Sequence, residues 1–235
     1  MLYLIGLGLS KESIGIEARE KCREADNVYL ESYTVDFPYK KEELEKTVGK
    51  EVEALGRDNV ESNRLVEEAG KEDVVLLVYG SPLMATTHIS LILEAKEKNV
   101  KCQIIHNASI FDAITNTGLQ AYKFGKTGSL PDWEEKGESK SFVDVIESNM
   151  RIKAHTLLLV DIGLELKEAL EELEEASEGK IKRLIVCSRL GCDEEKTYFD
   201  SVDNLKKFEV KKPYCFIIPS KLHFKEKEAL EKISE

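Results

Sequence analysis

The feature that most constrains this chain is the alternation, along its first half, of short apolar segments with charged segments of helical composition. The apolar segments are predicted to be strands at 2–5, 27–30, 73–79 and 101–106. The intervening helices are predicted at 14–25, 39–48, 58–69 and 86–98. Because strands that alternate with helices form parallel sheets with helical crossovers, the sequence predicts an α/β fold with a mostly parallel sheet.

The second half of the chain indicates a further domain of mixed structure. Strands are predicted at 155–161, 184–188 and 214–218, and long helices at 164–176 and 222–233. Residues 107–118 are short-sided and polar, which is typical of a connecting helix and hinge. A chain of 235 residues accommodates one large domain or two modest ones. We therefore expect two α/β domains, 1–112 and 113–235.

The composition excludes several classes of protein. A formal net charge of −11, with both halves acidic, disfavours nucleic acid as a partner. The apolar runs are far shorter than the roughly 18 residues that span a bilayer, and the first residues lack a signal-peptide pattern. We expect no membrane association and a cytoplasmic location. The five cysteines and four histidines form neither a CxxC motif nor a Cys/His cluster, so we expect reduced thiols and no metal site.

Two glycine turns directly follow predicted strands, at Gly6-Leu7-Gly8 and Gly80-Ser81-Pro82. Parallel sheets bind ligands at the carboxyl ends of their strands, so both turns are predicted to line a small-molecule site. The first turn resembles the start of a dinucleotide fingerprint, in which Glu31 would hold a ribose. The third glycine of that fingerprint would fall where the chain has Lys11, whose side chain prevents close packing against a pyrophosphate. A nicotinamide cofactor, another small ligand and a turn that serves chain geometry alone stay open at this point.

Three loops taken together are more specific than either turn alone. Leu4–Leu9, Gly80–His88 and His106–Ile110 resemble the S-adenosylmethionine-binding loops of the tetrapyrrole-methylase superfamily. Within it the chain is similar, from end to end, to the diphthine synthase family, and further matching segments lie at 117–126, 155–162 and 218–223. Two departures stand out. The superfamily's usual Gly-Asp-Pro has a serine in place of the aspartate here, and the chain is shorter around 127–140 and 162–182.

The resemblance implies a class III methyltransferase: a two-domain tetrapyrrole-methylase-like α/β fold with S-adenosyl-L-methionine in the cleft between the domains. It also implies a homodimer. The cofactor residues that it implies are Leu9, Ser81, Met84, Ser109, Ile110, Val160, Leu190 and Tyr214.

The implied reaction belongs to diphthamide biosynthesis. Methyl groups pass to the amine of a 3-amino-3-carboxypropyl group on a histidine of elongation factor 2, three times in archaeal members. Methyl transfer from a sulfonium requires alignment, exclusion of water and an unprotonated amine. We therefore assign no catalytic residue and no metal. Elongation factor 2 is the expected protein partner, and the segment 125–141, with Trp133, is predicted to be an exposed loop that meets it.

Two other functions remain as alternatives. One is a different methyltransferase of the same superfamily that acts on a tetrapyrrole or on ribosomal RNA. The acidity of both halves disfavours RNA, and the segments Ala85–His88 and Tyr122–Lys126 disfavour a tetrapyrrole. The other is a non-catalytic regulator that binds S-adenosylmethionine or a nucleotide.

Overall fold

The computed structural model describes residues 1–233, and their contacts separate the chain into two compact units. The first unit comprises Met1–Ile110, and the second begins at Phe111. No helix in the described part of the chain has the length and apolar character needed to cross a bilayer.

The first unit is built on a five-stranded sheet in which all neighbouring strands are parallel, in the order β3-β2-β4-β1-β5. Its strands are β1 (Leu2–Gly6), β2 (Asn27–Glu31), β3 (Glu53–Leu55), β4 (Val74–Val78) and β5 (Cys102–Ile105). In β1, Leu4 lies opposite Leu76 on one side and Ile104 on the other. The predicted α/β class with a mostly parallel sheet is confirmed.

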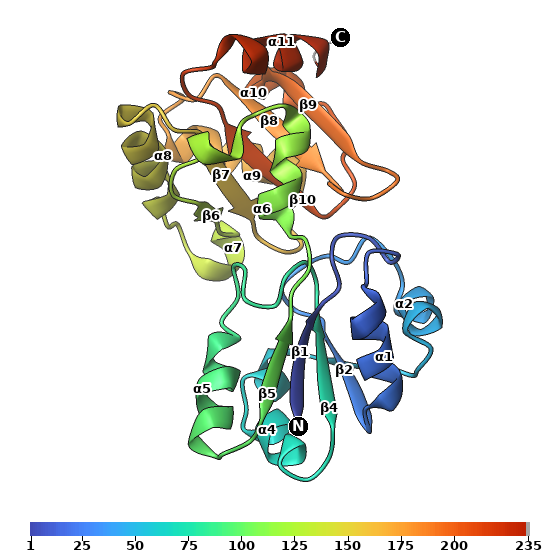
Figure 1. The fold of residues 1–235 in the computed structure, drawn as a ribbon. Coiled ribbons are helices and arrows are strands. Elements are labelled where there is room, and N and C mark those ends of the chain that lie inside the picture. The colour runs from blue at the N-terminus through green and yellow to red at the C-terminus, as the bar shows by residue number, and fades with distance from the viewer. Residues whose placement is uncertain (234–235) are drawn as a thin grey trace. The chain divides into compact units, whose positions relative to one another are not determined.

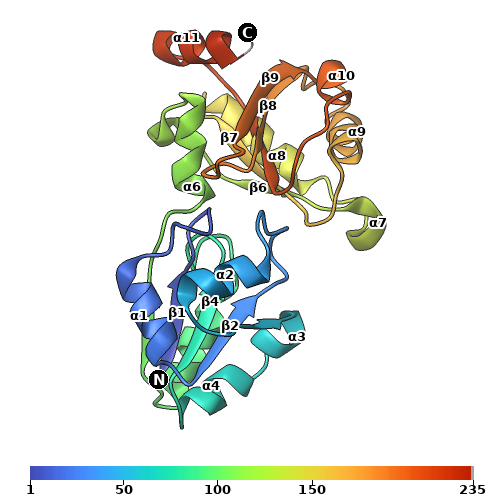
Figure 2. The same ribbon diagram turned by 90° about the vertical axis from the view of Figure 1, so that its right-hand side faces the viewer.

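Helices cover both faces of this sheet, which explains why β1 and β4 are apolar throughout. Figure 1 shows α1 and α2 on one side of the sheet and α4 and α5 on the other. Alternate residues of β1 divide between the two cores: Tyr3 and Ile5 pack with α1 and α2, whereas Leu2 and Leu4 pack with α4 and α5. The helices are α1 (Ile16–Glu24), α2 (Lys41–Val48), α3 (Arg57–Val60), α4 (Arg64–Ala69) and α5 (Ile89–Glu97). The single helix expected at 58–69 is divided into α3 and α4, which lie close together in Figure 2.

The strand order places a topological switch point between β1 and β4. From β1 the chain crosses through α1 to β2, on the far side of β4. From β4 it crosses through α5 in the opposite direction to β5, on the far side of β1. Because α1 and α5 lie on opposite faces of the sheet, the loops after these adjacent strands separate to opposite faces at the carboxyl ends, which is where open α/β sheets bind ligands.

The second unit contains a mixed sheet in the order β6-β7-β10-β8-β9, in which β6 and β7 are parallel and the other neighbours antiparallel. Its strands are β6 (Gly128–Leu130), β7 (Thr156–Val160), β8 (Arg183–Ser188), β9 (Lys196–Ser201) and β10 (Tyr214–Ile218). The three strands expected in this half are β7, β8 and β10; β6 and β9 were not predicted.

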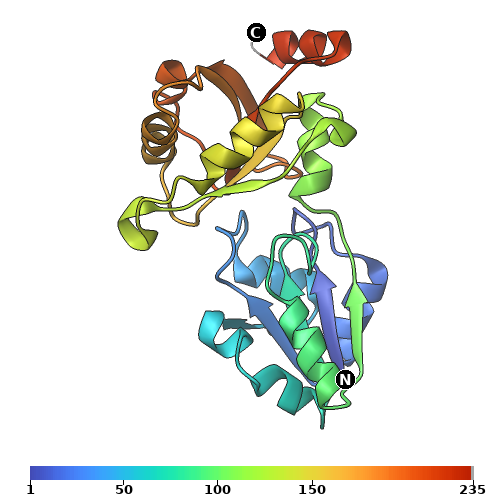
Figure 3. The same cartoon turned by 90° about the vertical axis from the view of Figure 1, so that its left-hand side faces the viewer.

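Helices of the second unit include two that pack their apolar faces on the sheet, α8 (yellow in Figure 3) and α9. After α6 (Ile110–Ala113), which begins at the boundary between the units, the described helices are α7 (Trp133–Lys136), α8 (Ser141–Arg151), α9 (Leu166–Ala176), α10 (Val202–Leu205) and α11 (Phe224–Ile233), with 3₁₀ turns η1 (Ile114–Thr117) and η2 (Ala121–Lys123). The prediction of an exposed loop over 125–141 is wrong in part, because Gly128 and Leu130 are buried in β6. Trp133, in α7, lines a shallow acidic hollow of about 190 Å³ together with Glu168 and Glu172.

Candidate functional site

The two predicted glycine turns meet at the switch point of the first sheet. The backbone N–H of Gly8 donates to the carbonyl of Gly80 at 3.0 Å, and the N–H of Gly80 donates to the carbonyl of Gly8 at 2.9 Å. This reciprocal pair is an isolated antiparallel bridge just beyond the ends of the parallel strands β1 and β4. The two loops therefore form one backbone surface at the carboxyl edge of the sheet.

Glycine is required at both positions of this pair. Gly8 and Gly80 have φ values of +73° and +69°, in the left-handed region that glycine adopts at little cost. A Cβ on Gly8 would lie 2.4 Å from the Cβ of Ser13, so that position also lacks space. A Cβ on Gly80 would lie 3.5 Å from the Cα of Ser109, at ordinary contact distance. The side of Gly80 that faces Ser109 is thus close-packed without a clash.

Asn107, just after β5, joins the third loop to the first. Its Nδ2 donates to the carbonyl oxygens of Gly6 at 3.1 Å and Ser13 at 3.0 Å, and its Oδ1 accepts from the N–H of Ala108 at 2.8 Å. Sequence reasoning quoted this residue within a loop but assigned it no role. The available signal was a polar residue directly after a buried strand, at the carboxyl edge where the other loops were expected.

Five cofactor residues were predicted in the first unit. Four of them have little side-chain exposure and lie in or directly beside these three loops. Leu9, Ser81 and Ser109 are buried, and Ile110 is partly buried at the start of α6. Met84 is different, because 43% of its surface is exposed. The structure therefore brings the first-unit residues to one edge of the sheet, and Met84 is not part of the core.

Tyr79 and His106 each contact one of the predicted cofactor residues. The hydroxyl of Tyr79 donates to the carbonyl of Leu9 at 2.9 Å, and Ser81 Oγ lies 3.4 Å from His106 Nδ1. These contacts link the end of β4 to the first loop and the second loop to the end of β5. Both are consequences of strand order, which places β1 between β4 and β5.

His88 holds the second loop against the beginning of α5. Its Nδ1 lies 3.0 Å from the carbonyl oxygen of Pro82, so Nδ1 carries the proton and donates. Thr86 Oγ1 donates to the same carbonyl at 2.7 Å. Burial lowers the pKa of His88, which keeps the imidazole neutral at physiological pH. These bonds give His88 a structural role in the loop.

The three cofactor residues predicted in the second unit lie at the same end of its sheet, at the carboxyl ends of β7 and β8 and the amino end of β10. Tyr214 begins β10 opposite Ser188 of β8, and Val160 ends the neighbouring strand β7. Leu190 is buried in the loop after β8. The side chain of Tyr214 is itself mostly buried, and its hydroxyl donates to the carbonyl of Leu164 at 2.9 Å.

The segments 117–126, 155–162 and 218–223, which carry the resemblance in the second unit, lie around the buried carboxylate of Glu226. Its Oε1 accepts from the N–H of Gln120 at 3.0 Å and from His155 Nε2 at 3.2 Å. Its Oε2 accepts from the N–H of His223 at 2.7 Å and from Lys123 Nζ. His155 Nδ1 accepts from the N–H of Ser220 at 2.9 Å, so the proton is on Nε2 and the ring is neutral. This cluster holds α11 in place and is a structural feature of the fold.

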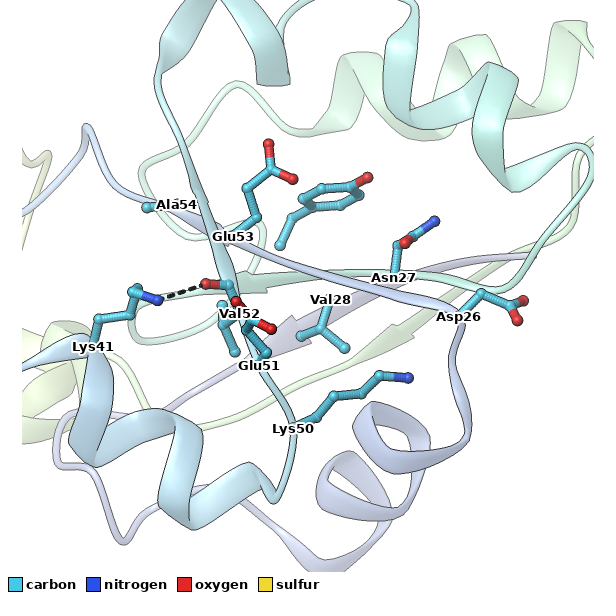
Figure 4. Close-up of a pocket in the computed structure, with 10 residues that line it drawn as sticks. Asp26, Asn27, Val28, Lys41, Lys50, Glu51, Val52, Glu53 and Ala54 are labelled. Atoms are coloured by element: carbon cyan, nitrogen blue, oxygen red, sulfur yellow. Dashed lines mark hydrogen bonds between the residues drawn. The ribbon is translucent and has the colours of Figure 1, made fainter.

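A pocket of about 580 Å³ opens at the amino ends of β2 and β3 (Figure 4). Asp26 and Asn27 line one part of it, and Lys41, whose Nζ donates to the carbonyl of Val52 at 3.0 Å, lines another. The predicted cofactor residues are not among its lining residues. The pocket is thus at the opposite edge of the sheet from the glycine loops.

Comparison with known proteins identifies the family of this chain. A model of the tetrapyrrole (corrin/porphyrin) methylases matches residues 1–206. A diphthine synthase from Archaeoglobus fulgidus is 40% identical, with 100% of this chain and 96% of that protein covered. One from Methanocaldococcus jannaschii is 36% identical, with coverage of 100% and 99%. The chain belongs to the diphthine synthase family, within the tetrapyrrole methylases. A crystal structure of a diphthine synthase has a TM-score of 0.91 to this diphthine synthase family member at 39% identity, with coverage of 100% and 96%.

Membership of the diphthine synthase family makes the protein an S-adenosylmethionine-dependent methyltransferase, and the cofactor implied by the resemblance is confirmed. The glycine loops fit such a cofactor. They present backbone atoms and small hydroxyls, from Ser81 and Ser109, beside the apolar Leu9 and Ile110. Small-molecule sites commonly combine apolar side chains with a few backbone and hydroxyl groups in this way. Within the described residues there is no group of three or more His, Cys, Asp or Glu side chains that could hold a metal ion.

Proposed function

We propose that this protein methylates the amine of a 3-amino-3-carboxypropyl group on a histidine of elongation factor 2. The observation that carries the proposal is the end-to-end similarity to diphthine synthases, at 40% identity with the Archaeoglobus fulgidus protein. The three loops joined by Gly8, Gly80 and Asn107 support it, because the backbone surface that the methyl donor requires is present.

In the proposed reaction, the amine lone pair attacks the methyl carbon of the sulfonium. The carbon–sulfur bond breaks and its electron pair stays on sulfur. After each of the first two transfers an ammonium proton leaves to solvent, whereas a third transfer gives a trimethylammonium that has no N–H proton to lose. We propose that Leu9, Ser81, Met84, Ser109 and Ile110 bind the donor from the first unit. From the second unit, we propose that Val160, Leu190 and Tyr214 contribute to the same site, so that each of the two expected domains supplies part of it. The role of the protein is then to align donor and acceptor and to exclude water.

Further features of the resemblance remain proposals about this chain. We propose three successive transfers to each amine, a homodimer, and action in the cytoplasm without nucleic acid or membrane. Mass spectrometry of the modified factor counts the methyl groups, and light scattering measures the mass of the protein in solution.

The decisive experiment offers labelled S-adenosylmethionine together with elongation factor 2 that carries the aminocarboxypropyl-histidine. The control is the same factor without that modification. Label on the modified factor alone supports the proposal. Failure to label it would falsify the proposal, and label on a tetrapyrrole or ribosomal RNA instead would favour another member of the superfamily.

A substitution at Gly80 tests the position of the cofactor. Gly80→Asp places a charge on the shared loop surface and is expected to abolish binding of S-adenosylhomocysteine, measured by calorimetry. Gly137→Asp is the matched control, because Gly137 also has a positive φ, of +81°, and open space around it. Unchanged affinity in the Gly80 variant would remove the second loop from the proposed site.

A further inference from the structure

The segment that contains the second cofactor loop has no charged residue of its own, and the carboxylate of Glu61 lies against it, where it accepts from Thr87 Oγ1 at 3.2 Å. The chain has no Asp, Glu, Lys or Arg between Val74 and Leu93, although 34% of its residues are charged. The first part of this stretch is β4, which is buried. The remainder, from Gly80 to Leu93, forms the loop and the first half of α5. An uncharged segment of this length on the outside of an acidic protein needs a physical reason.

Three large apolar side chains project from this segment. Ile89 and Leu93, one helical turn apart on α5, are 53% and 56% exposed, and Met84 of the preceding loop is 43% exposed. Residues four apart share a helix face, so Ile89 and Leu93 are neighbours. The inward side of α5 is provided by Leu91 and Ala95, which are buried in the core. The exposed residues are therefore not needed to pack the helix on its sheet.

The properties of this face indicate the kind of molecule that covers it. Interface centres are depleted of charged residues and enriched in apolar ones, because burying an unpaired charge is costly. α5 has 9 residues and is about 14 Å long, so the face spans one short helix and the loop before it. A stable dimer buries about 800 Å² per partner, whereas weak, transient contacts are smaller. The size fits a partner that binds and leaves.

We propose that the face formed by Met84, Ile89 and Leu93 docks an apolar, uncharged segment of the protein substrate. The face is continuous with the loop that contains Ser81, so a segment seated on it would lie directly beside the proposed donor site. This inference rests on the proposed function, and it replaces the segment 125–141, with Trp133, as the expected docking surface.

The test uses the double variant Ile89→Glu, Leu93→Glu in the full-length protein. Its KM for the modified elongation factor is expected to rise roughly tenfold or more, because two apolar contacts are lost and two charges would be buried. Its affinity for S-adenosylhomocysteine is expected to remain that of the wild type. Ile16→Glu is the matched control, since Ile16 is 71% exposed on α1, on the other face of the same sheet. The control is expected to leave both values unchanged.

The outcomes separate this inference from the proposed function. If the wild-type protein does not methylate the factor, the proposed function fails first and the docking inference fails with it. If the wild type is active and the double variant has the same KM as Ile16→Glu, the docking inference alone is overturned. A change in molecular mass by light scattering with an unaltered KM also overturns it, because the face would then join two copies of the chain. Should the double variant fold poorly, the milder Leu93→Gln is measured with the same readouts.

Discussion

Among residues 1–233, each unit encloses one fully buried glutamate, and the surroundings of the two carboxylates shift their pKa values in opposite directions. Glu31, at the end of β2, accepts a hydrogen bond from Thr34 Oγ1 at 2.7 Å through Oε2, while its Oε1 is buried without a hydrogen bond of normal geometry. The backbone N–H groups of Tyr33 and Thr34 also favour its ionised form, but less strongly than burial opposes it. Glu226, in α11, has both oxygens occupied by two backbone amides, Lys123 and His155. Burial raises the pKa of Glu31. Burial acts on Glu226 in the same direction, but the donors around it prevail and lower its pKa to about 2.

The difference shows that enclosure alone does not decide the charge of a buried acid. The number of donors aimed at the ionised form decides it. In the second unit the carboxylate connects the segment around η2, β7 and α11, so its ionised form stabilises the fold. In the first unit the ionised form of Glu31 destabilises the fold, because burial disfavours the charge. Removing the negative charge of each glutamate should therefore change stability in opposite directions.

The largest effect is expected from Glu226→Ala. Its removal leaves His155 Nε2 and two backbone N–H groups without their acceptor and leaves Lys123 Nζ with only the carbonyl of Lys221, so the free energy of unfolding should fall by about 3–5 kcal/mol. Trp133 is the only tryptophan and lies in the second unit, so its fluorescence during urea unfolding reports on this unit. Glu228→Ala is the control on the same helix. Its carboxylate makes surface pairs, and a change within about 0.5 kcal/mol is expected. Equal effects of the two substitutions would contradict the structural role of Glu226.

The pH dependence of the second unit should follow from the same carboxylate. The folded pKa of Glu226 lies below the ordinary value of 4.5, so its stabilising contribution is present above that value and is lost as the pH falls toward 2. The loss amounts to about 3 kcal/mol. The stability difference between wild type and Glu226→Gln, measured by Trp133 fluorescence, should therefore shrink across this range. A difference that is constant with pH would show that the low pKa is not linked to folding.

A smaller loss of stability is expected in the first unit from Thr34→Val. This substitution removes the hydroxyl that donates to Glu31 and should cost about 1.5 kcal/mol at neutral pH, since the acceptor is charged and buried. Hydrogen exchange of the β2 amides, 27–31, measures the local stability. Thr34→Ser keeps the hydroxyl and serves as the control. If Ser and Val variants exchange alike, the hydrogen bond contributes nothing measurable.

The smallest effect, of opposite sign, is expected from Glu31→Gln. A carboxyl whose pKa is raised in the folded state contributes stability below its unfolded pKa and loses it as the pH rises. The neutral amide avoids that loss, so the variant should be more stable than wild type by about 1 kcal/mol at pH 7, and the gain should vanish in acid. Glu20→Gln, at an exposed position of α1, is the control and should show no such trend. Destabilisation at pH 7 would mean that the ionised form of Glu31 has a partner in solution.

Much of the first unit could be predicted from local pattern. Its apolar runs are strands, and Gly6–Gly8 and Gly80–Pro82 are the turns that follow them, because a doubly covered strand must be apolar throughout and a sharp turn needs glycine. The second unit was harder. The short strand β6 and the half-buried strand β9 lack a continuous apolar run, and the sequence around 125–141 was interpreted as a loop. The family and its methyl donor followed from the combination of three loops, and the comparisons bear them out.

Sequence alone determined the α/β class, the glycine turns and the family to which the chain belongs. Tertiary structure decided which loops touch and which carboxylates are satisfied. Glu31 ends a strand and Glu226 lies in a charged helix, and neither setting shows whether the carboxylate will have donors. Lys123 and Glu226 are 103 positions apart, and Asn107 is 101 positions from Gly6. Contacts over such separations depend on the packing of whole elements, which no local pattern of residues contains.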